Sequence, residues 1–322
     1  MATVESKEDM RLIVASQFTN WQNISKDGEQ AYDRSVILEL VDHLMKTIKA
    51  DGYQDIKTLN LILPFITNCA CSGTEFADKV VRETCVLEVI RDIATQKQAF
   101  DQPILLKTVV GVIRSLIDTD LNEQDLLAFI QPTITCFLAT GEEDVMSIVE
   151  CVLILKEYAS KHDDLIPKFA TGQVITKLCT LLASKDANIY TPVALTLACT
   201  FVYDQSPTII DRAILDGVLQ KFLNILYSGG GSELYHQILW GLSNITGCYC
   251  SHVAAFLQEE ELVQRVITLT QNPSHLIKSE AMYVITNAIQ CADVNTRMQF
   301  LDVFKQDLIN SLCNSLDRTT AR

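Results

Sequence analysis

The chain has 322 residues, of which 48% are hydrophobic, so it can bury a large core and intrinsic disorder is excluded. Its few glycines (12) and prolines (7) disfavour an all-β sandwich and a glycine-rich nucleotide-binding fold. A formal net charge of −14 argues against nucleic acid or an anionic membrane as a partner and favours basic partners.

The compartment can be judged from the cysteines and from the first residues. Eleven cysteines are typical of a reduced cytosolic or nuclear protein. Residues 1–11 are polar and charged and lack the apolar core of a secretory signal. Charged residues interrupt every apolar run well before eighteen positions, the length that a membrane-spanning helix needs. We therefore expect a soluble protein of the cytoplasm and nucleus.

Apolar residues follow helical spacing along almost the whole chain. Residues 35–49 carry one such stripe, formed by Val36, Ile37, Leu40, Val41, Leu44 and Met45. Residues 218–227 carry another, formed by Leu219, Phe222, Leu223 and Ile225. Strict alternation bounded by hairpin turns is not found. The sequence predicts an all-α protein of many short helices.

One pattern recurs along the chain: a small or apolar residue, an apolar residue four later, a polar residue two beyond that, and then an apolar one. Residues 238–245 and 281–288 are its clearest copies. With weaker copies included, the polar positions are Asn68, Ser115, Glu157, Thr200, Asn244 and Asn287, spaced 42 to 47 residues apart. A second register, the expected starts of the preceding helices, is spaced 44 to 46 residues apart, at Gly172, Gly217, Glu261 and Asp307.

This period is that of armadillo and HEAT repeats, whose units of two or three helices stack because none can bury its apolar face alone. We expect a right-handed superhelical α-solenoid of about six to seven repeats, forming a single domain over residues 1–322. Residues 1–75 are expected to form an irregular N-terminal capping repeat and 76–292 the regular repeats. Residues 293–317 should form a partial repeat with a first and a second helix. Pro64 falls where a third helix is expected, so either that helix begins near it or the first repeat is irregular.

Two successive repeats carry polar and aromatic residues on one helix face. Gln237, Trp240 and Asn244 are spaced three and four residues apart and share a face, whereas Ile238, Leu242 and Ile245 project from another face toward the core. The next repeat has Glu280, Tyr283 and Asn287 in register. If these helices lie side by side, the two aromatic rings form the walls of a slot and the amides its floor. Such a slot suits a peptide backbone and the stem and cation of Lys or Arg.

Residues 237–247 resemble the third helix of an armadillo repeat in importin alpha, where the pattern is Glu/Gln-x-x-Trp-x-x-x-Asn. Residues 278–288 are similar to the neighbouring repeat, with Tyr283 where the family has Trp. The detailed resemblance covers residues 210–317, and upstream only the period is shared. It implies a nuclear-import adaptor that holds a basic nuclear-localisation peptide. The implied peptide-binding residues are Gln237, Trp240, Asn244, Glu280, Tyr283 and Asn287.

The sequence also departs from that family. At the aromatic positions of the upstream repeats stand Pro64, Gly111, Leu153 and Thr196, and Ser115, Glu157 and Thr200 replace three asparagines. Acidic and basic residues are interspersed over residues 1–50, without the basic run that binds importin beta in the family. We therefore expect no direct binding of importin beta through the N-terminus. We expect no counterpart of the family's last repeats after residue 317.

Catalytic and metal-binding motifs do not stand out. Cys248, Cys250 and His252 are the best zinc candidates, but the four ligands of a structural site are usually two spaced pairs, and the other close cysteine pair is about four repeats away. The five histidines are expected in turns or on helix surfaces, without a nucleophile at a recognisable spacing. We expect no enzyme, no cofactor and no bound metal.

Other roles for Trp240 and other functions for the protein remain open at this point. Trp240 could be a core aromatic between repeats. The protein could instead be a scaffold or assembly factor that binds a folded partner through its acidic convex surface or an end of the array. It could also be a chaperone or exchange-factor regulator.

Overall fold

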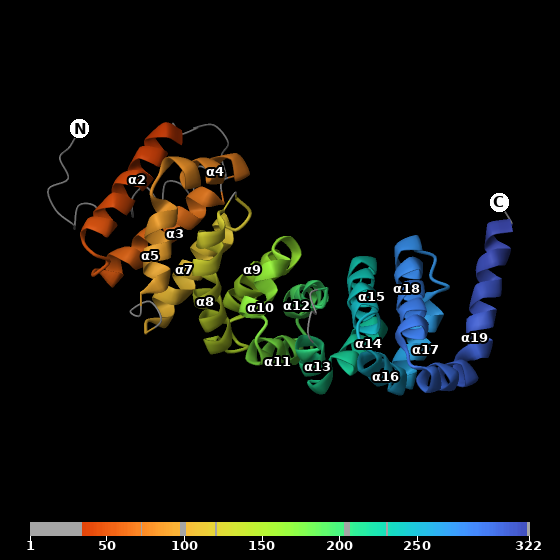
Figure 1. Ribbon diagram of the computed structural model, residues 1–322. Coiled ribbons are helices and arrows are strands. Elements are labelled where there is room, and N and C mark those ends of the chain that lie inside the picture. Colours follow the sequence, from red (N-terminus) through yellow and green to blue (C-terminus); the bar gives the residue numbers. More distant parts are fainter. Residues whose placement is uncertain are drawn as a thin grey trace. The chain divides into compact units, whose positions relative to one another are not determined.

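The computed structural model describes residues 34–71, 73–96, 101–119, 121–202, 207–229 and 231–320 (Figure 1). Every regular element in these ranges is a helix and none is a strand, which confirms the predicted all-α class. None of these helices combines the length and the apolar character that crossing a membrane requires. The chain divides into two compact units, Met1–Ile154 and Leu155–Arg322, with the boundary inside α9 (Val145–Lys161). The single domain over 1–322 stays a prediction.

The first unit contains six helices before α9 within its described residues. They are α2 (Arg34–Ala50), α3 (Ile56–Ala70), α4 (Thr74–Glu83), α5 (Val86–Thr95), α7 (Pro103–Leu116) and α8 (Glu123–Ala139). Helix α3 packs along α7, and α5 packs along α8. Side chains cap two of the helices: Asp55 accepts a hydrogen bond from the Thr58 amide, and Asn122 accepts one from the Asp125 amide.

Pro64 lies in the middle of α3, so the first of the two alternatives for this proline, a helix that begins near it, is wrong. The helix starts at Ile56, where Asp55 provides the N-cap. Packing of α3 against α7 holds the helix together on both sides of the proline, since Leu63 and Phe65 beside it are buried.

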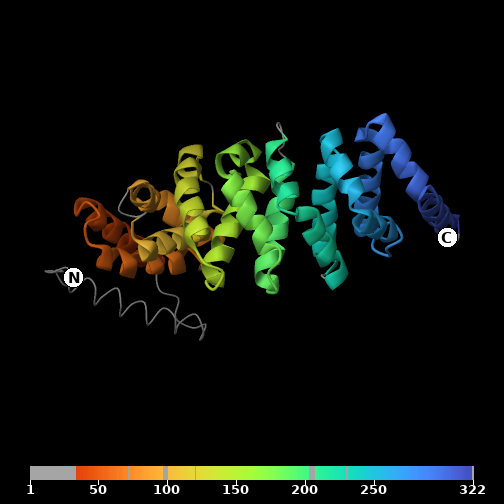
Figure 2. The same cartoon turned by 90° about the horizontal axis from the view of Figure 1, so that it is seen from below.

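The second unit continues with one short 3-10 helix and ten α-helices in its described part. They are η1 (Asp163–Leu165), α10 (Ile166–Phe169), α11 (Gly172–Leu181), α12 (Ala187–Thr200), α13 (Thr208–Leu215), α14 (Val218–Ser228), α15 (Ser232–Thr246), α16 (Cys250–Gln258), α17 (Glu260–Leu269), α18 (His275–Cys291) and α19 (Val294–Thr320). From green to blue they follow one another in chain order (Figures 1 and 2). Helix α15 packs between α12 and α18.

The predicted period is confirmed by the helix bounds. Each of the six recurring polar positions, from Asn68 to Asn287, lies toward the C-terminal end of a long helix, namely α3, α7, α9, α12, α15 or α18. We refer to these six as the third helices. Among the described residues, the repeat that ends in α9 has only two helices, because α8 is the next helix after α7.

The third helices of the second unit approach closely because of a glycine. A Cβ atom built on Gly241 of α15 would lie 3.2 Å from the Ala198 Cβ and 3.3 Å from its Cα on α12. Ile238, Leu242 and Ile245 are fully buried, as the sequence predicted. The small pair Gly241–Ala198 therefore sets the spacing of α12 and α15.

The partial repeat differs from expectation. Residues 294–320 form one continuous helix, α19, so the prediction of two helices over 293–317 is wrong, and Asp307 lies inside a helix instead of starting one. The segment contains neither glycine nor proline, so nothing in it breaks a helix. Asp293 caps its start, because one carboxylate oxygen accepts hydrogen bonds from the amides of Asn295 and Thr296.

Candidate functional site

Helix α15 presents Gln237, Trp240 and Asn244 as half-buried side chains. Trp240 is therefore not sealed in the core between repeats, unlike Leu239 and Gly241 on either side of it. No hydrogen bond of the described residues involves its indole. Gln237 donates a hydrogen bond to Glu233 Oε1, one turn earlier, at 2.9 Å. The indole thus combines partial exposure with an N–H group that is available to a ligand.

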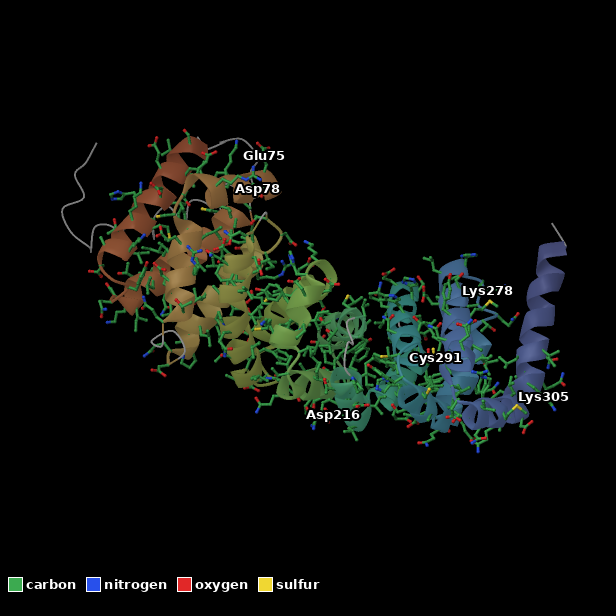
Figure 3. The ribbon with its side chains drawn as sticks, viewed as in Figure 1. Glu75, Asp78, Asp216, Lys278, Cys291 and Lys305 are labelled. Atoms are coloured by element: carbon green, nitrogen blue, oxygen red, sulfur yellow. The ribbon has the colours of Figure 1, made fainter. Side chains whose placement is uncertain are left out.

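Helix α18 places Glu280, Tyr283 and Asn287 between Lys278 and Cys291, which Figure 3 labels toward its two ends. Tyr283 is 59% exposed, although Val284 beside it is fully buried. Its hydroxyl group has no hydrogen-bond partner among the described residues. Since α15 and α18 pack side by side (Figure 1), the predicted residues come from two neighbouring helices of one unit.

The two amides join successive third helices. Asn244 Nδ2 lies 3.5 Å from the Ala198 carbonyl oxygen on α12, and Asn287 Nδ2 donates to the Ser243 carbonyl oxygen on α15 at 2.9 Å. We call this pair of contacts the amide ladder. Each amide keeps its Oδ1 and a second N–H for other partners. The sequence had suggested only contacts to a peptide, so the ladder is an additional, structural role.

The ladder predicts unequal costs for removing the two amides. Asn287→Ala should lower the free energy of unfolding by about 1 kcal/mol, because it breaks a short hydrogen bond. Asn244→Ala should cost less, because its contact is at the limit of hydrogen-bonding distance. Urea unfolding followed by circular dichroism measures both values. A larger loss for Asn244→Ala would contradict this role of the ladder.

Glu280 lies beside a residue that sequence reasoning missed. Its Oε1 is 3.7 Å from Nε2 of His236 on α15, and burial raises the pKa of the Glu280 carboxyl group above its ordinary value. The Nδ1 atom of His236 is buried and lacks a partner among the described residues. The signal that could have found the pair is its spacing of 44 residues, one repeat period. A cationic ligand would compete with a protonated His236 for this carboxylate.

The Cys248–His252 stretch has a structural arrangement. His252 is 1% exposed, so its expected place on a helix surface or in a turn is wrong. It is buried because α16 packs this side against α13, where its Nε2 lies 2.9 Å from Asp211 Oδ1. Among the described residues, no three His, Cys, Asp or Glu side chains are grouped closely enough to hold a metal ion.

No protein-family model matches the sequence, and no curated protein matches it either. Solved structures do. A designed armadillo-repeat protein called YIII(Dq)4CqI shares 15% identity at a TM-score of 0.58, covering 76% of this chain and 99% of its own. Armadillo-repeat proteins computationally designed for modular peptide recognition give 14% identity and a TM-score of 0.59, over 77% and 99%. A designed armadillo-repeat protein solved in complex with the peptide (KR)4 gives 15% and 0.57, over 76% and 99%.

At these identities the likeness concerns the fold and nothing else. It covers about three quarters of the chain and nearly all of each designed protein, and it agrees with the repeat period and the stacked third helices. The chain therefore has the all-α solenoid fold of armadillo-repeat proteins.

Proposed function

We propose that the protein is a non-enzymatic adaptor that holds an extended, basic peptide of a partner across α15 and α18. The observation that carries this proposal is the pair of aromatic side chains, Trp240 and Tyr283, left outside the core on neighbouring third helices. Both carry hydrogen-bond donors that no described residue uses. Aromatic faces attract the cations of Lys and Arg and cover their methylene stems.

The repeat spacing suits an extended chain. Packed helices lie about 10 Å apart, and an extended peptide advances about 3.3 Å per residue, so one repeat corresponds to about three peptide residues. Asn244 and Asn287 recur at this spacing, and each retains an acceptor and a donor beyond the ladder. The amides would hold the peptide backbone, while the rings and Glu280 would select its cations.

Charge and fold neighbours support a basic ligand. The net charge of −14 attracts cations, and a designed protein of the same fold is in complex with (KR)4. The resemblance of residues 210–317 to importin alpha extends the proposal to nuclear import of a cargo, with the protein in the cytoplasm and nucleus. In this proposal importin beta is not bound through residues 1–50, which lack a basic run.

Affinity capture from a nuclear and cytoplasmic lysate tests this function. The native chain should retain proteins that share Lys/Arg-rich segments, and the variant Trp240→Ala/Tyr283→Ala should lose them. If the variant captures the same proteins, the exposed faces of α15 and α18 are not the binding site.

Glu280 should strengthen the attraction for a basic peptide. Glu280→Gln is expected to weaken (KR)4 binding roughly fivefold, about 1 kcal/mol, and to make it less sensitive to salt. Because burial raises the pKa of Glu280, the native affinity should begin to fall closer to neutral pH than an ordinary glutamate would allow. Calorimetric titration at several pH values and salt concentrations measures both effects. Glu261→Gln, an exposed carboxylate in the first turn of α17, is the control and should change little.

A second candidate function is a scaffold that binds a folded partner. It is favoured by an apolar stripe on α19, where Val294, Met298 and Ile309 share a face and are 72%, 54% and 50% exposed. Met298→Glu would disrupt this stripe and leave α15 and α18 unchanged. If Met298→Glu abolishes capture of partners and Trp240→Ala/Tyr283→Ala does not, the result supports a scaffold that binds its partner through α19.

A further inference from the structure

A cleft of about 410 Å³ opens in the first unit. It is bordered by the C-terminal end of α3, the start of α4, the helix α7, and Glu150 of α9. Its lining includes Cys71, Gly111, Arg114, Asp118 and Glu150. These residues lie outside the site on α15 and α18.

The cleft exists because α7 has a glycine where the repeat pattern places an aromatic residue. Apart from the adjacent residues and the backbone of α7 itself, a Cβ atom on Gly111 would have one neighbour within 4 Å, the Glu150 Oε2 at 3.9 Å. The recurring polar position of the same helix, where later repeats have Asn244 and Asn287, is Ser115, which is also small. The absence of a large side chain at position 111 therefore leaves an open path to the Glu150 carboxylate.

Glu150 is half-buried and makes no hydrogen bond or ion pair with any described residue. Its burial raises the pKa of the carboxyl group, and the nearby charge of Asp144 acts in the same direction. The guanidinium of Arg114 is the cation beside it, but Arg114 is paired with Asp118 at 3.2 Å. With Arg114, Asp118 and Glu150 ionised, the cleft carries one excess negative charge.

The hydroxyl groups of the cleft point to the same ligand chemistry. Thr67, Ser115 and Thr119 each donate their hydroxyl proton to a backbone carbonyl of the preceding helical turn, at 3.2, 2.7 and 2.6 Å. Their oxygen atoms are then left as acceptors. Three such oxygens and two carboxylates oppose one charged donor group, the Arg114 guanidinium, so the lining suits a ligand rich in N–H donors and disfavours an anion.

We propose that this cleft binds an ammonium or guanidinium group next to Glu150, with Gly111 providing the space. The group would come from a Lys or Arg side chain of a bound peptide or from a free polyamine. The inference does not rest on the proposed function, because its residues belong to the other unit. The cation would form an ion pair with the Glu150 carboxylate and donate further hydrogen bonds to the hydroxyl oxygens.

Alkylation of cysteines gives a local readout. Cys71 lines the cleft and is exposed, whereas Cys250 is exposed on α16 in the second unit and serves as the internal reference. The full-length variant Trp240→Ala/Tyr283→Ala, which lacks both aromatic rings of the site on α15 and α18, is labelled with iodoacetamide and followed by peptide mass spectrometry. The added probes are spermidine, as a free amine, and (KR)4, as a peptide.

We expect at least one probe to slow labelling of Cys71 at least fivefold and to leave Cys250 unchanged. Protection by spermidine identifies a free amine as sufficient, and protection by (KR)4 alone identifies a peptide side chain. Glu150→Gln, which keeps the shape of the side chain, should remove the protection, and Gly111→Leu should remove it by filling the cleft. Glu75→Gln, an exposed carboxylate on α4 (Figure 3) paired with Lys79, is the matched control and should retain it.

The proposal is overturned if neither probe protects Cys71. It is also overturned if a probe protects Cys71 as well in the Glu150→Gln variant as it does with Glu150 present. Equal protection of Cys71 and Cys250 would indicate unspecific binding to the acidic surface and would overturn it too. A failure of peptide binding at Trp240 leaves these outcomes unaffected, because that site is already removed in the variant used.

Discussion

Replacing Trp240 and Tyr283 with alanine is expected to weaken binding of (KR)4 roughly 30-fold, or about 2 kcal/mol. Each ring would cover one Lys or Arg side chain of the peptide, at about 1 kcal/mol per partly desolvated contact. Isothermal titration calorimetry of the native chain and of the double variant measures the difference. The fold should persist, because neither ring is buried in the core.

The matched control is Tyr227→Ala on α14. Tyr227 is also 59% exposed, but its ring lies under the Arg265 guanidinium and outside the proposed groove. Its loss should leave the affinity for (KR)4 within a factor of two. If Tyr227→Ala weakens binding of (KR)4 as much as the double variant does, the binding reflects unspecific attraction to exposed tyrosines.

Gly241→Val is expected to lower the free energy of unfolding by about 1–3 kcal/mol. Its Cβ would approach the Ala198 Cα and Cβ at 3.3 and 3.2 Å, so α12 and α15 must move apart or distort. Phe222 Cε2, at 3.7 Å, closes the remaining side. Helix propensity acts in the opposite direction, since glycine is the poorer helix former, so a measured loss reports on packing.

The control for this prediction is Gly172→Ala. Gly172 is the exposed first residue of α11, and no atom lies within 4 Å of the Cβ that alanine would add. Its replacement should change the urea midpoint very little, within about 0.5 kcal/mol. If Gly241→Val leaves the free energy of unfolding unchanged, α12 and α15 have space for a larger side chain. That result would contradict the close contact of Gly241 with Ala198.

The repeat architecture could be predicted from the sequence because its signals recur. Apolar residues at helical spacing recur in successive repeats. A polar residue near the end of each third helix recurs once per repeat, as with Asn244 and Asn287. Repetition separates this pattern from chance. The face of Trp240 could be predicted for the same reason, since Ile238 and Leu242 fix which side of α15 is buried.

Other features depend on contacts between distant residues and left no such signal. The hydrogen bond from Asn287 to the Ser243 carbonyl depends on the distance between two helices. The burial of His252 depends on the packing of α16 on α13, which also brings it to Asp211. Pro64 lies inside α3 because that helix packs on α7, and the local preference of proline carries no information about this packing. Gly111 stands out in the sequence as a glycine at an aromatic position, but the cleft beside Glu150 also depends on how α3, α4, α7 and α9 pack.

Fluorescence of Trp240 during a titration with (KR)4 is the most direct test of the proposal that a basic peptide binds across α15 and α18. The chain contains a second tryptophan, Trp21, which lies outside the described residues, so the titration uses Trp21→Phe as the parent. We predict a saturable shift of the Trp240 emission that Asn244→Ala/Tyr283→Ala reduces and that added salt weakens. An emission spectrum unchanged at peptide concentrations that saturate binding by calorimetry would contradict peptide binding across α15 and α18.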